Sequence, residues 1–135
     1  MNRARPWLGA IALDAAGVLV FATAGRESHD EGASLPGILG VAAPFLLGAI
    51  AGTGVVVAAH RSPLSWWGGF GAWSGALVGG MLLRRLAWDR GTAPSFVVVT
   101  AVVLALLFFG WRALWASVGG RRAVRSPGPP TAAES

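Results

Sequence analysis

The sequence has no cysteine, no tyrosine and no lysine, and it has only two histidines, His29 and His60. The absence of cysteine excludes disulfides, thiolate catalysis, iron–sulfur clusters and cysteine-ligated zinc. Two histidines leave little from which to build another metal site, and no nucleophile stands at a recognisable spacing from a base. We therefore expect no metal, no cofactor and no enzymatic activity.

Charged residues are also scarce, because they make up 13% of the chain, whereas a soluble domain carries about 25%. The apolar residues, 54% of the total, are gathered in four stretches, 7–24, 36–59, 66–83 and 94–111. Each stretch is close to the ~20 residues that a helix needs to cross a ~30 Å hydrocarbon layer. Only helices can satisfy the backbone of so short a chain in that layer. The sequence therefore predicts an all-α integral membrane protein.

The predicted architecture is a four-transmembrane-helix antiparallel bundle, residues 1–118, with helices over about 7–24, 36–59, 66–85 and 94–118. Short connections make consecutive helices antiparallel neighbours. Residues 119–135 are rich in glycine, proline and arginine, which predicts a disordered basic tail. The first stretch resembles a secretory signal, but its length and the presence of Asp14 within it favour an uncleaved first helix.

The eleven arginines give a net charge of +5 and predict the orientation of the chain. With both termini in the cytoplasm, six arginines lie on the inner side and four on the outer side, while Arg112 falls inside the fourth helix. We therefore expect a multi-pass protein of the cell (plasma) membrane with both termini cytoplasmic. Because the arginines lie in tails, loops and helix ends, anionic lipid headgroups suit them better as partners than nucleic acid.

Glycines at four-residue spacing predict close helix contacts. Gly71, Gly75 and Gly79 share one face of the third helix, and Gly48 and Gly52 share one face of the second. Small residues at this spacing allow two helix backbones to approach. The seams could join helices within one bundle or pair two protomers in a homo-oligomer, and packing within the bundle is the default interpretation.

Two charged residues inside the predicted helices lie at matching depth. Asp14 follows Trp7 by seven residues, or ~10 Å along a helix. Arg112 precedes Val118 by six residues in a helix that runs the other way. A charge in hydrocarbon costs several kcal/mol unless it is paired or hydrated, so we expect an ion pair between Asp14 and Arg112.

This pair has three interpretations. It is a latch that fixes the register of helices one and four, or Asp14 is a proton-linked or substrate-binding carboxylate, or Arg112 snorkels to the inner headgroups. A fixed guanidinium stabilises the charged carboxylate and makes proton exchange unfavourable. The latch is therefore the favoured interpretation.

A second group of residues is expected at the outer surface. Arg26 and His29 lie at the end of the first helix, and Arg84 lies at the end of the third. Together they could form a basic cup for an anion or a lipid phosphate. The alternative is ordinary interfacial snorkelling with solvated ion pairs.

A series of short motifs runs in order through all four predicted helices. They are Asp14, Phe21, Gly25-Arg26-x-Ser28-His29, Pro44-Phe45 with Gly48, Arg61-x-Pro63, Trp73, Gly80-Met81-Leu82-Leu83-Arg84, Ser95-Phe96 and Gly110-Trp111-Arg112. This series resembles the uncharacterised family catalogued as domain of unknown function 3054. The resemblance implies a small integral membrane protein without an established activity, and it marks Asp14, Arg26, His29, Arg84 and Arg112 as motif positions.

Two functions of different class remain open from the sequence. In the first, the protein is a structural or accessory membrane component whose buried charges hold the bundle together. In the second, it is a small oligomeric transporter or channel-like module that uses Asp14 and the outer arginines. Small multidrug-resistance transporters also carry an acidic residue in their first helix, but their other motifs are missing here. The sequence favours the first function, and it names no protein partner.

Overall fold

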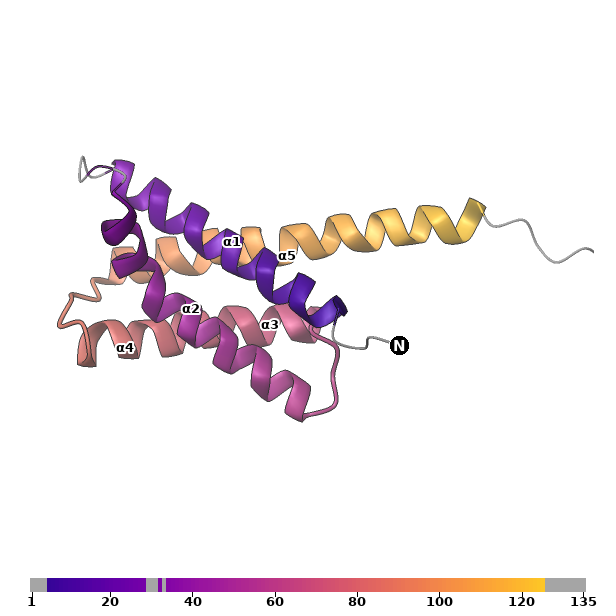
Figure 1. Ribbon diagram of the computed structural model, residues 1–135, viewed down its shortest axis with the longest axis horizontal. Helices are drawn as coiled ribbons and strands as arrows, with labels where there is room; N and C mark the ends of the chain where they lie inside the picture. The colour runs from indigo at the N-terminus through magenta and orange to yellow at the C-terminus, as the bar shows by residue number, and fades with distance from the viewer. Residues whose placement is uncertain (1–4, 29–31, 33, 126–135) are drawn as a thin grey trace, which may run out of the picture.

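The computed structural model describes residues 5–28, 32 and 34–125, and this part of the chain contains helices and no strand. Three helices are long: α1 (Arg5–Ser28), α2 (Leu35–Ala58) and α5 (Pro94–Arg125). Between α2 and α5, three helical pieces follow one another directly: α3 (Trp66–Ser74), the π-helix η1 (Gly75–Gly79) and α4 (Gly80–Leu86). Together, α3, η1 and α4 form a fourth helical segment, which packs beside the three long helices (Figure 1). The helices α1 and α5 run in opposite directions.

Three of these helices are long and apolar enough to cross a membrane, over Leu8–Glu27, Leu35–Ala58 and Pro94–Gly119. The all-helical prediction is thus confirmed for the described residues. The predicted third helix, 66–85, is helical throughout, but η1 divides it, so none of its three pieces alone reaches the length of a span. Glycine, which has a low helix propensity, begins and ends η1. Two of the three seam glycines in this helix, Gly75 and Gly79, thus lie where it departs from α geometry.

The last helix is longer than the sequence predicted. It ends at Arg125, so residues 119–125 continue α5 and correct the predicted start of the tail, while 126–135 lie outside the described residues. Residues 113–119 are all exposed, and Figure 1 shows the end of α5 projecting past the other helices.

Serine side chains cap the N-termini of two of the helices, α2 and α3. Ser34 Oγ accepts a hydrogen bond from the Gly37 N–H at the start of α2, and Ser65 Oγ accepts one from the Gly68 N–H at the start of α3. Each bond satisfies one of the backbone donors that a helix leaves unpaired in its first turn. These caps fix where α2 and α3 begin, and the Ser65 cap lies at the end of the loop that joins α2 to α3.

The core at the centre of the described bundle is built from aromatic and aliphatic side chains. Val18, Phe21, Phe45, Leu104 and Phe108 from α1, α2 and α5 are buried together. The rings of Phe21 and Phe45 meet edge to face, with centroids 5.5 Å apart. This cluster fixes α1, α2 and α5 relative to one another.

The predicted glycine seams face each other within one chain. A Cβ added at Gly52 would overlap the carbonyl oxygen of Gly71, and one added at Gly48 would overlap that of Gly75. A Cβ at Gly79 would stand 3.2 Å from the Gly48 Cα. The seams therefore join α2 to α3 and η1, which is the intramolecular alternative.

Candidate functional site

The two buried charges come from antiparallel helices near one end of the bundle. Asp14 lies in α1 and Arg112 in α5. Their side chains are 4% and 1% exposed, respectively. The low exposure of the guanidinium rules out the interpretation in which Arg112 snorkels to the headgroups.

The structure joins these two side chains by two parallel hydrogen bonds. Arg112 Nη1 donates to Asp14 Oδ1 at 2.8 Å, and Arg112 Nη2 donates to Asp14 Oδ2 at 2.9 Å. This fork-to-fork arrangement is the strongest geometry between a guanidinium and a carboxylate, and it fixes orientation as well as distance. Lysine, with a single ammonium group, could not reproduce it.

The remaining donors of Arg112 bind backbone carbonyls. Nη1 also donates to the Phe108 carbonyl at 2.9 Å, one turn earlier in α5. Nε and Nη2 both donate to the Pro63 carbonyl, at 3.3 and 2.9 Å. A guanidinium has five N–H groups, and these five bonds occupy them all. Because Pro63 lies in the loop between α2 and α3, Arg112 ties that loop to α1 and α5.

Trp111 is a third member of the site, although in the sequence it stands out only as part of the Gly110-Trp111-Arg112 motif. Its indole N–H donates to Asp14 Oδ1 at 2.8 Å, so the carboxylate accepts three hydrogen bonds. The guanidinium carbon of Arg112 also lies 4.2 Å from the centroid of the indole ring, a cation–π distance. We call Asp14, Trp111, Arg112 and the Pro63 carbonyl the polar hub.

Two consecutive glycines at the start of α3 make room for the hub. A Cβ added at Gly68 would overlap the backbone of Pro63, and one added at Gly69 would stand 3.0 Å from the Arg112 Cδ. Both glycines are buried. They let α3 approach closely enough for the loop carbonyl to reach the guanidinium.

The predicted outer cluster is only partly visible. Arg26 Nε donates to the Gly32 carbonyl at 3.0 Å, and Arg84 Nε donates to the Gly91 carbonyl at 3.1 Å. Arg84 also lies over the Phe96 ring, 4.5 Å from its centroid. These bonds go to different loops and do not join the two arginines into one cup, and His29 lies outside the described residues. The cup thus stays a prediction.

No group of three or more histidine and acidic side chains within residues 5–28, 32 and 34–125 is arranged to hold a metal ion. A family model described as a protein of unknown function, DUF3054, matches residues 11–115, a range that contains all four members of the polar hub. No curated protein and no solved structure matches the chain.

Proposed function

Because the chain belongs to the DUF3054 family of proteins of unknown function, its role has to come from its own geometry, and we propose that it is a non-enzymatic structural or accessory protein of the cell membrane. In this proposal four helical segments cross the membrane, both termini lie in the cytoplasm, and the polar hub locks the bundle. Membrane lipids, including anionic headgroups, are its proposed surroundings.

The exposed side chains support insertion into a membrane. Large apolar residues are exposed along each long helix, for example Leu13 on α1, Leu47 on α2 and Leu106 on α5. In water such continuous apolar surface would mark a partner site or an aggregation hazard, whereas lipid covers it without cost. Residues 66–86 are helical over 21 residues, or ~32 Å at 1.5 Å per residue. That length supports a fourth crossing despite the π-turn.

The observation that carries the structural role is the complete occupation of the Arg112 N–H groups. A proton carrier or substrate site must release its carboxylate during each cycle. Here release of Asp14 would break three hydrogen bonds and leave a buried guanidinium without its counter-charge. The hub therefore suits a permanent lock better than an exchanging group.

A flux measurement tests this proposal against the transport alternative. The full chain is reconstituted into liposomes and screened with protons, alkali cations and small anions, beside Asp14→Asn and the control Asp89→Asn. Asp89 is exposed in the connection between α4 and α5. We expect no flux above that of empty liposomes for any of the three proteins. Flux that Asp14→Asn abolishes and Asp89→Asn preserves would replace the structural role by transport.

A further inference from the structure

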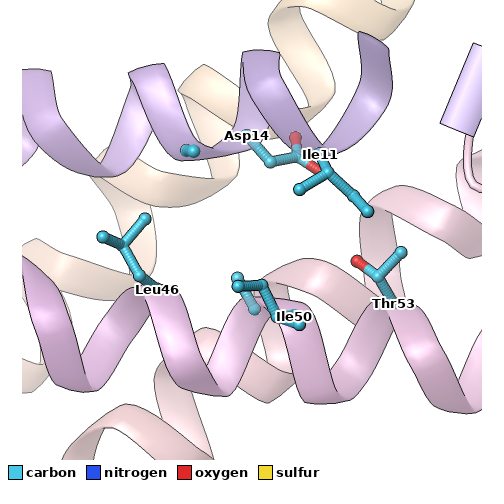
Figure 2. Close-up of a pocket in the computed structure, with 7 residues that line it drawn as sticks. Ile11, Asp14, Leu46, Ile50 and Thr53 are labelled. Atoms are coloured by element: carbon cyan, nitrogen blue, oxygen red, sulfur yellow. The ribbon is translucent and has the colours of Figure 1, made fainter. Parts of the chain in front are cut away.

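A small cavity lies beside the polar hub, between α1 and α2. It is lined by Asp14 and Thr53 and otherwise by apolar side chains, among them Ile11, Leu46 and Ile50. Figure 2 shows Asp14 on the α1 side of the gap and Thr53 on the α2 side. The space in the cavity that the centre of a water molecule can occupy is about 10 Å³. This is about the space that one bound water molecule requires.

Thr53 is a buried polar side chain that has no partner within the described part of the chain. It is 3% exposed, and no hydrogen bond of its hydroxyl to a described residue is present. The other buried threonine, Thr100, instead donates to the Phe96 carbonyl one turn earlier, at 2.7 Å. Every fully buried polar side-chain atom in the described residues has a hydrogen-bond partner. The unpartnered Thr53 hydroxyl therefore keeps some accessible surface, and Thr53 lines the cavity.

Asp14 has one acceptor position left. A carboxylate offers about four lone-pair sites, and Trp111 and Arg112 occupy three of them. The unoccupied site belongs to Oδ2, which accepts a single bond from Arg112. Asp14 and Thr53 both line the same small space.

We propose that one water molecule binds in this cavity, donating a hydrogen bond to Asp14 Oδ2 and forming a second with the Thr53 hydroxyl. A cation does not fit, because Arg112 already balances the charge of Asp14 and the cavity provides no second carboxylate. A larger neutral ligand exceeds the volume. Water is neutral, donates to the carboxylate and can either donate to or accept from the hydroxyl.

The water extends the hub to a further helix. The direct bonds of the hub join α5 to α1 and to the loop before α3. A water held by Thr53 adds a polar link from α1 to α2 across an otherwise apolar contact. The inference depends on the cavity and its two polar groups, and it holds whether the protein has a structural or a transport role.

Water-to-protein magnetisation transfer in solid-state NMR tests the proposal on the full chain in lipid bilayers. The expected result is rapid transfer to Asp14 Cγ and Thr53 Cβ, but not to Thr100 Cβ, whose residue is completely buried. Thr53→Val, which keeps the side-chain shape, should abolish transfer to Asp14 Cγ, whereas Thr53→Ser should preserve it. Thr100→Val is the matched control and should leave the transfer unchanged.

The Trp111 indole N–H signal reports whether each variant keeps the hub, because that proton is bound to Asp14. An unchanged indole signal together with the loss of transfer in Thr53→Val supports the bound water. The proposal would be overturned if, in the wild-type protein, Asp14 Cγ received no more magnetisation from water than Thr100 Cβ does. Equal transfer to Asp14 Cγ in wild type and in Thr53→Val would also overturn the proposal. If Thr53→Val disturbs the fold, Thr53→Ser is measured instead, and loss of the transfer in that variant would overturn the proposal.

Discussion

Asp14→Asn and Arg112→Gln should each destabilise the fold strongly, and the two changes together should cost less than either change alone. The reason is that each single change leaves one charge of a buried pair without its counter-charge. Breaking such a pair typically costs ~3–5 kcal/mol, while exchanging both partners for neutral groups can cost little.

The contacts of the hub refine these magnitudes. Asparagine at position 14 keeps one oxygen as an acceptor but places an amide N–H₂ against a guanidinium nitrogen, so the full ~3–5 kcal/mol should be lost. Arg112→Gln strands the carboxylate and also removes both donors from the Pro63 carbonyl. A buried carbonyl without a donor costs a further ~1–3 kcal/mol. The double variant has no buried charge and should lose only about this last amount, ~1–3 kcal/mol.

Reversible unfolding of the full chain in mixed detergent micelles measures these free energies. The matched control combines Arg61→Gln with Asp89→Asn, which are exposed residues in two different loops. Their losses should add to within ~0.5 kcal/mol, as expected for distant sites. Losses that are strictly additive for Asp14→Asn and Arg112→Gln would refute the idea that the two residues compensate each other.

Two further predictions follow from other contacts, and a third tests the proposed topology. Trp111→Phe keeps the ring but removes a hydrogen bond to a charged group, and should lower the free energy of unfolding by ~1.5–3 kcal/mol; an unchanged value would contradict the bond. Gly52→Ala places a Cβ against a backbone carbonyl and should cost ~1–3 kcal/mol in the same assay, whereas Gly54→Ala, which meets open space, should be neutral or mildly stabilising. For the proposed topology, a reporter fused at Ser135 should be active only in the cytoplasm, and a cysteine at Ala33 should react with an impermeant reagent from outside; the reverse pattern would invert the orientation.

The pairing of Asp14 with Arg112 could be predicted because the cost of burying a charge limits the arrangements that the chain can adopt. The helices were likewise visible as apolar stretches of spanning length. The glycine spacing predicts a seam, but whether that seam joins helices of one chain or of two chains depends on the three-dimensional packing. These are properties that a linear pattern of residue types determines.

The other parts of the hub follow from three-dimensional detail. The partner of the Arg112 Nε is a backbone carbonyl, and every residue carries such a group, so nothing in the residue type of Pro63 announces it. In the sequence, the clearest indication of this contact is the pair Gly68 and Gly69, because the absence of side chains at these positions lets the loop lie close to α3. The π-turn and the cavity beside Thr53 also depend on small displacements between packed helices, which no residue pattern specifies.

The most direct test of the account is the dipolar coupling between the Arg112 Nη atoms and Asp14 Cγ, measured by solid-state NMR on the full chain in lipid bilayers. Direct N–O contacts of 2.8 and 2.9 Å predict a strong coupling to both terminal nitrogens. The coupling should persist whether or not small cations and anions are present, because a structural lock has no cycle in which it opens. A coupling too weak for direct contact, or one that disappears when a particular ion is added, would contradict the lock.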